Sequence, residues 1–106
     1  MQKIEDITKI IQENQAVMVY FSAPSCNVCH ALKPKLYDAI ENNFTLFKNI
    51  SVDISVSQDV AAHFGVFTIP TIIVFLEGNE FIKKSRNMSI NEVVEQIRRP
   101  YEMMLS

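Results

Sequence analysis

The stretch that decides the fold is residues 16–29, Ala16-Val17-Met18-Val19-Tyr20-Phe21-Ser22-Ala23-Pro24-Ser25-Cys26-Asn27-Val28-Cys29. It begins with an apolar run, which predicts a buried strand. A short break follows, and then come the only two cysteines of the chain, three positions apart. If a helix opens at Asn27, both sulfurs lie in its first turn, where free backbone N–H groups and the helix dipole favour a thiolate. The stretch therefore predicts a redox-active dithiol at the end of a strand.

The composition of the whole chain is that of one domain, spanning residues 1–106. Ten basic and twelve acidic residues give a net charge of -2 without a long cluster of either sign, so we expect neither a nucleic-acid partner nor a membrane surface. We find neither a signal peptide nor an apolar stretch that would span a bilayer, and we expect a cytoplasmic protein. In a reducing compartment a close cysteine pair is more often catalytic or metal-binding than structural.

Four helices are predicted from apolar residues that recur at helical spacing. They cover residues 3–14 within an N-terminal helical region 1–15, residues 27–40, residues 58–64 and residues 90–99. Pro34 should kink the second helix. Ser57 is expected to cap the third helix and Gly65 to close it.

Four strands are predicted at residues 16–22, 44–54, 71–76 and 80–84. Glu77-Gly78-Asn79 separates the last two strands as a hairpin turn, whereas the first two need a parallel crossover. The order α-β-α-β-α-β-β-α predicts an α/β protein with a mixed four-stranded sheet and helices on both faces.

The end of the chain is predicted from Ser89 and Glu92, which form a capping-box signature for the last helix. Pro100 is expected to stop that helix. Residues 100–106 would then be a short C-terminal tail, in which Met103 and Met104 are better explained by disorder than by a contact surface.

Three features together resemble the thioredoxin family over residues 16–99. They are Ala23-Pro24-Ser25-Cys26-Asn27-Val28-Cys29 after a strand, Pro34 in the following helix, and Thr68-Ile69-Pro70-Thr71 before the hairpin. A bare Cys-x-x-Cys is common, but its combination with both prolines at this spacing is specific. The resemblance implies a thioredoxin-like three-layer sandwich and a thiol-disulfide oxidoreductase.

The resemblance also implies the roles of individual residues. Cys26 would be the attacking nucleophile and Cys29 the resolving thiol of a redox-active disulfide. Pro70 would be a cis-proline facing the pair, and the backbone of Ile69 would bind an extended substrate peptide. The substrate would be a protein or small-molecule disulfide, and a reductase or a low-molecular-weight thiol would donate electrons. Neither a metal nor another cofactor is required.

The chain departs from the family pattern near the dithiol. Ser25 replaces the usual tryptophan, and Asn27-Val28 replaces Gly-Pro, so Val28 restores a backbone N–H donor that we expect to make the disulfide more oxidising. Tyr20 occupies the position of the family's buried acid, and Asn49 occupies the position of its lysine. Proton transfer from Cys29 would therefore use water or another group. The usual glycine after the last strand is replaced near Arg86-Asn87, where asparagine tolerates a left-handed conformation.

Other functions remain open at this point. Cys26 to His30 matches the Cys-x-x-Cys-His signature of haem attachment. A zinc site would add His30 and His63 to the cysteines, and an iron-sulfur cluster would bridge two chains. A thioredoxin-like binding or chaperone-type module without reductase turnover is the main alternative, because fold alone does not fix function.

Overall fold

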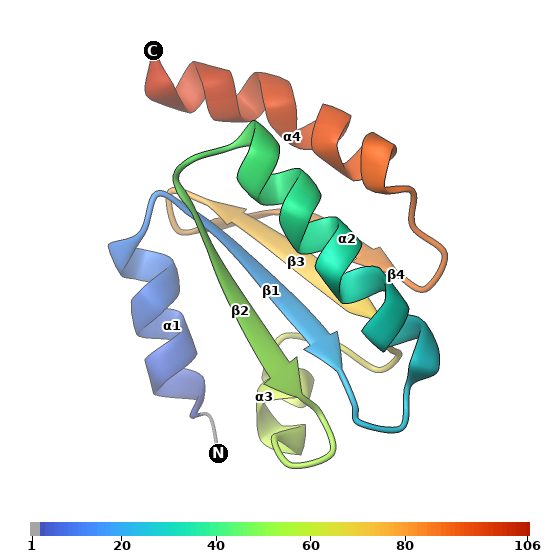
Figure 1. Cartoon of the computed structure of the whole chain (residues 1–106). Coiled ribbons are helices and arrows are strands. Elements are labelled where there is room, and N and C mark those ends of the chain that lie inside the picture. The colour runs from blue at the N-terminus through green and yellow to red at the C-terminus, as the bar shows by residue number, and fades with distance from the viewer. Residues whose placement is uncertain (1–2) are drawn as a thin grey trace.

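The computed structural model describes residues 3–106 and is shown in Figure 1. Its elements are α1 (Ile4–Glu13), β1 (Ala16–Ser22), α2 (Asn27–Asn43), β2 (Phe47–Asp53), α3 (Gln58–His63), β3 (Thr71–Leu76), β4 (Asn79–Ser85) and α4 (Ile90–Leu105). The predicted order of helices and strands is confirmed. Within the described residues, no helix combines the length and the apolar character needed to cross a bilayer.

The sheet has the strand order β2-β1-β3-β4 in the described part of the chain. β1 and β2 are parallel, whereas β1 and β3, and β3 and β4, are antiparallel. β1 is hydrogen-bonded on both sides, and its residues 16–21 are fully buried. The predicted mixed four-stranded sheet is therefore confirmed, with the apolar run before the cysteines as a central strand.

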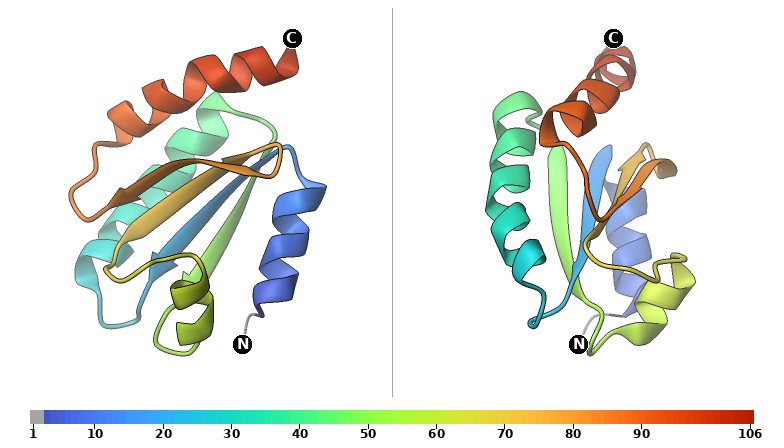
Figure 2. Two further views of the ribbon diagram at one scale, coloured as in Figure 1. Left: turned by 180° about the vertical axis from the view of Figure 1, so that it is seen from behind. Right: turned by 90° about the vertical axis from the view of Figure 1, so that its right-hand side faces the viewer.

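Helices cover both faces of the sheet, as Figure 2 shows edge-on. Met18 and Tyr20 of β1 point into a core shared with α2 and α4. Val17 and Val19 point the other way, into a core shared with α1 and α3. This alternation is the period of two of a strand buried on both sides. The predicted three-layer sandwich is confirmed.

The turns follow the expected residues with one exception. Glu77 and Gly78 connect β3 to β4, and both have positive φ, 51° and 83°, as a two-residue hairpin loop of the right twist requires. Gly65 has φ 68° and lies just after α3. Ser57 occupies the N-cap of α3, but its side chain makes no capping hydrogen bond, so the predicted side-chain cap is absent.

The prediction that Pro100 ends the last helix and leaves a tail at residues 100–106 is wrong. α4 continues through Pro100 to Leu105. Tyr101 is 5% exposed, its ring centroid lies 4.8 Å from that of Phe44, and its hydroxyl accepts a hydrogen bond of 3.0 Å from the Leu46 amide. This packing offsets the backbone hydrogen bond that proline cannot make.

The same aromatic contacts shorten the second strand. Residues 44–54 were expected to be a strand, but Phe44 is the C-cap of α2 and β2 begins at Phe47. The Phe44 side chain is buried and packs against both Phe47 and Tyr101. Residues rich in strand formers therefore serve partly as a loop that closes the end of the core.

Candidate functional site: the dithiol and the loop before β3

The dithiol lies at the carboxyl end of β1, where the chain turns into α2 (Figure 1). Strand register brings two other segments to the same edge of the sheet. Ser22 at the end of β1 pairs with Asp53 at the end of β2, and Phe21 pairs with Thr71 at the start of β3. The Ile69–Pro70 segment, which immediately precedes Thr71, is therefore at the same end of the molecule as the cysteines.

Cys26 and Cys29 form a disulfide whose Cα atoms are 5.3 Å apart. Cys26 is the N-cap of α2, and the Cys29 amide donates a 3.2 Å hydrogen bond to the Cys26 sulfur. The Cys26 side chain is half-buried, whereas Cys29 is 1% exposed. A helix N-terminus that donates an amide to sulfur stabilises the thiolate once the disulfide is reduced. The two sulfurs thus differ in access and in hydrogen bonding.

Backbone contacts hold the segment before α2 against its first turn. The Cys26 amide donates to the Ala23 carbonyl at 3.0 Å. The exposed His30 ring has Nε2 2.8 Å from the Pro24 carbonyl, and because a carbonyl oxygen only accepts, this nitrogen carries the proton. His30 therefore fixes the loop that presents Cys26.

Tyr20 lies directly beneath the dithiol. Its hydroxyl donates a 2.7 Å hydrogen bond to the Cys29 carbonyl, and its side chain is fully buried. Burial, and secondarily the neighbouring Tyr37, raises the pKa of Tyr20 to about 12. A phenol with such a pKa stays neutral near pH 7, so Tyr20 positions the first turn of α2 without adding a charge. The sequence identified the replacement of an acid but gave no sign of this bond.

A polar layer between α2 and β2 adjoins Tyr20. The rings of Tyr20 and Tyr37 meet edge to face with centroids 6.1 Å apart. The Tyr37 hydroxyl and Asn49 Oδ1 are buried without a hydrogen-bond partner in the described structure. Lys33 Nζ donates to Ser51 Oγ at 3.3 Å, and Ser51 lies two residues from Asn49 on the same face of β2. Lys33 of α2 thus places a positive charge on the face of β2 that carries Asn49, the residue at the position of the family's lysine.

The loop before β3 contains a cis peptide bond between Ile69 and Pro70. Pro70 is buried and Ile69 is half-buried. Within residues 3–106 neither the amide nor the carbonyl of Ile69 makes a backbone hydrogen bond. The Arg86 amide donates to the Pro70 carbonyl at 2.7 Å, and Arg86 itself has φ 62°. The left-handed residue after β4 is therefore Arg86 and not Asn87, because this hydrogen bond places the turn one residue earlier.

The histidines considered for zinc are not brought together. His30 is on α2 and His63 is on α3, and these helices cover opposite faces of the sheet (Figure 2). Among residues 3–106 no group of three or more histidine, cysteine, aspartate or glutamate side chains is placed to hold a metal ion. In the described structure, the four residues considered as zinc ligands therefore do not form one site.

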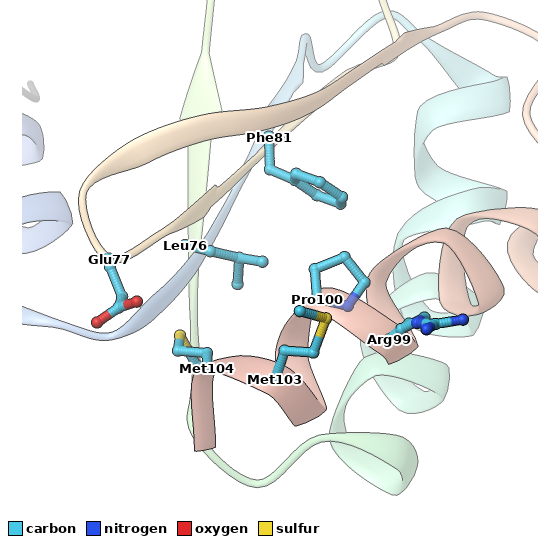
Figure 3. Close-up of a pocket in the computed structure, with 7 residues that line it drawn as sticks. All are labelled: Leu76, Glu77, Phe81, Arg99, Pro100, Met103 and Met104. Atoms are coloured by element: carbon cyan, nitrogen blue, oxygen red, sulfur yellow. The ribbon is translucent and has the colours of Figure 1, made fainter. Parts of the chain in front are cut away.

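A separate apolar pocket of about 510 Å³ lies at the other end of the sheet (Figure 3). Leu76 lines it from β3, and Met103 and Met104 line it from α4. Leu76 pairs with Ala16, the first residue of β1, whereas the cysteines follow the last. This pocket is not part of the dithiol site.

The comparisons with known proteins agree with this geometry. The Thioredoxin family model matches residues 3–99. The thioredoxin-like protein YdfQ of Bacillus subtilis is 27% identical over 103 residues, which cover 97% of this chain and 91% of that protein. Thioredoxin 1 of Thermosipho africanus is 30% identical with a TM-score of 0.71, covering 85% of this chain and 99% of that structure. A mutant thioredoxin of Halobacterium salinarum shares the fold with a TM-score of 0.81 at 20% identity, covering 95% of this chain and 87% of that one. With its close Cys-x-x-Cys pair, the chain belongs to the thioredoxin family of thiol-disulfide oxidoreductases.

Proposed function

We propose that Cys26 is the attacking nucleophile and Cys29 the resolving thiol in exchange with protein or small-molecule disulfides. The observation that carries this assignment is the difference between the two sulfurs. Cys26 is half-buried at the helix N-cap and accepts the Cys29 amide, whereas the Cys29 side chain is 1% exposed. A substrate disulfide reaches the more accessible sulfur, and the amide and helix dipole favour its thiolate form once the disulfide is reduced.

The exchange needs two steps. The Cys26 thiolate attacks one sulfur of the substrate disulfide, which forms a mixed disulfide and releases the other substrate sulfur as a thiolate. Cys29 then loses its proton and attacks the Cys26 sulfur, which releases the second substrate thiolate and closes the Cys26–Cys29 bond. The protein loses two electrons and the substrate gains them, and solvent protons neutralise the released thiolates.

We assign substrate binding to Ile69 and Pro70. The Ile69 amide and carbonyl make no backbone hydrogen bond in the described chain, so they are available to an extended peptide, as in strand addition. Pro70 lacks an N–H, which keeps a competing donor out of the site. Both residues immediately precede Thr71, which pairs with Phe21 at the end of the sheet where the dithiol lies.

Turnover requires an electron donor, for which we propose a reductase or a low-molecular-weight thiol of the cytoplasm. Cysteine usage supports that compartment, because the only two cysteines of the chain are those of the dithiol. The test is whether cytoplasmic thiol pools reduce the disulfide of the purified protein.

Two serine variants test the roles of the cysteines. Cys26→Ser should abolish exchange, whereas Cys29→Ser should accumulate a mixed disulfide that mass spectrometry detects after acid quenching. If Cys26→Ser traps the substrate and Cys29→Ser does not, the roles are reversed. If wild-type protein binds disulfide peptides without oxidising its own dithiol, the chain is a binding module and not a reductase.

A further inference from the structure

A groove of about 390 Å³ runs from Val28, which lies between the two cysteines, along the seam between α2 and the start of α4. We call it the α2–α4 groove. Its apolar lining comes from Val28, Ala31, Leu32, Met88 and Ile90, and Lys35 is its one charged residue. The volume lies at the lower end of the range of about 300–1,000 Å³ that is usual for ligand sites. The groove has room for side chains of a larger molecule.

We propose that the α2–α4 groove is a substrate subsite, which binds an apolar side chain next to the reacting cysteine of a polypeptide disulfide and a carboxylate beyond it. This inference rests on the proposed function and names the class of substrate. The preferred substrate is a peptide segment in which leucine-like and acidic residues flank the cysteine.

The groove begins beside the dithiol. Val28 lies between the two cysteines, is 63% exposed and lines the groove. Cys26, Leu32 and Met88 all pack on the core between the sheet and the α2–α4 layer. A polypeptide whose cysteine reacts at Cys26 therefore passes next to the apolar lining of the groove.

The groove is also continuous with the proposed peptide-binding edge. The Arg86 amide donates to the Pro70 carbonyl, so the segment that follows β4 starts next to Pro70. Two residues later, Met88 lines the groove. An extended peptide bound at Ile69 thus lies beside residues 86–88, and this segment leads into the groove. Its side chains alternate, so the residue two positions from the cysteine faces the same way as the cysteine.

Charge complementarity indicates that the second substrate group bound by the groove is a carboxylate. Lys35 is exposed and forms no ion pair in residues 3–106. On α4, Glu92 pairs with Lys84 at 3.1 Å and Glu95 pairs with Arg98 at 3.4 Å, so both carboxylates have other partners. Lys35 lies two helical turns from Val28, about 10 Å along the axis of α2. A carboxylate two residues beyond the apolar side chain lies about 7 Å further along an extended peptide, and the long glutamate and lysine side chains cover the rest of that distance.

The experiment measures single-turnover oxidation of the reduced protein by peptide disulfides. Each substrate is a pair of identical peptides joined through one cysteine, with leucine two residues and glutamate four residues to either side of it. Comparison peptides replace leucine with serine or glutamate with lysine. The second-order rate constant is divided by that for 2-hydroxyethyl disulfide, which has no side chains to enter the groove.

The wild-type ratio should be about tenfold higher for the leucine peptide than for the serine peptide, as expected for burying most of one leucine side chain. Ala31→Gln, which adds bulk at an exposed position of the groove, should remove most of this preference. Lys35→Glu should lower the ratio for the glutamate peptide about fivefold and raise it for the lysine peptide. Lys9→Glu on α1 makes the same charge change on the opposite face and should leave all ratios unchanged.

The outcomes separate this proposal from the proposed function. If wild-type protein oxidises its dithiol with all peptides at the same ratio, or if Lys35→Glu and Lys9→Glu behave alike, the groove is not a substrate subsite although the exchange chemistry stands. If no disulfide oxidises the dithiol, the proposed function itself is wrong. A preference for leucine that Ala31→Gln leaves intact places the apolar contact elsewhere and also overturns the proposal.

Discussion

The buried hydroxyl groups of Tyr20 and the half-buried Tyr37 differ in hydrogen bonding, which predicts opposite effects of losing them. The Tyr20 hydroxyl donates to the Cys29 carbonyl at 2.7 Å, whereas the Tyr37 hydroxyl is buried and makes no hydrogen bond within residues 3–106. Tyr20→Phe should lower the free energy of unfolding by about 1 kcal/mol, and Tyr37→Phe should raise it by about the same amount. Chemical denaturation measures both. Equal effects of the two variants would contradict this arrangement.

The pKa of Tyr20 makes stability depend on pH in the alkaline range. An unfolded tyrosine ionises near pH 10, whereas burial holds the pKa of folded Tyr20 at about 12. The folded state therefore binds more protons between these values, so the contribution of Tyr20 is complete below pH 10 and is lost as the pH rises towards 12. The unfolding free energy should fall over this interval, and less steeply in Tyr20→Phe. Identical slopes would show that Tyr20 ionises freely in the folded protein.

Val28 is expected to set the redox potential through its backbone N–H. A first-turn amide stabilises the Cys26 thiolate and hence the reduced protein, which raises the potential. Val28→Pro should lower the potential by about 30 mV, equivalent to about 1.4 kcal/mol for two electrons. Asn27→Pro is the matched control, because it changes the neighbouring residue and keeps the Val28 amide. A wild-type potential at or below that of Val28→Pro would refute this role.

At the scale of elements, the last turn of α4 depends on Tyr101. Its ring packs on Phe44 and Phe47, and its hydroxyl accepts the Leu46 amide. Tyr101→Ala should therefore cost about 3 kcal/mol of unfolding free energy. Met103→Ala, at a position 66% exposed, should change it by less than about 0.5 kcal/mol. Small effects of both variants would mean that residues 100–105 are not docked on the core.

Sequence reasoning succeeded where a signal is local and strong. The apolar run of β1, the helical period of α2 and the positions of Gly65 and Gly78 each indicate their structure within a few residues. It failed at residues 44–46 and 100–106 for one reason. Phe44 and Tyr101 are far apart in the sequence, and their packing overrides both the strand propensity of one segment and the proline of the other.

The candidate site shows the same limit at the residue scale. The cysteine spacing predicted a dithiol in the first turn of a helix, and the structure places Cys26 at the N-cap with the Cys29 amide on its sulfur. The bond from Tyr20 to the Cys29 carbonyl and the left-handed Arg86 were not predicted. Both depend on which segments meet across the sheet, and periodicity carries no such information.

For the whole molecule, the sheet register brings the dithiol and the proposed substrate-binding loop to one end of the sheet. The dithiol, the Ile69–Pro70 loop and Arg86 meet at the carboxyl end of β1. The apolar pocket in Figure 3 lies at the opposite end. Chemistry and substrate recognition are therefore expected to change with variants at the first end, and stability alone with variants such as Tyr101→Ala at the other.

The proposed function requires that Cys26 and Cys29 exchange reversibly between a dithiol and an intramolecular disulfide. The most direct test equilibrates the purified protein in graded ratios of oxidised to reduced dithiothreitol, tags free thiols with an alkylating reagent and counts the tags by mass spectrometry. We predict one reversible two-electron transition in which both cysteines lose their tags together. Cysteines that stay tagged at every ratio, or that oxidise only between chains, would contradict the account.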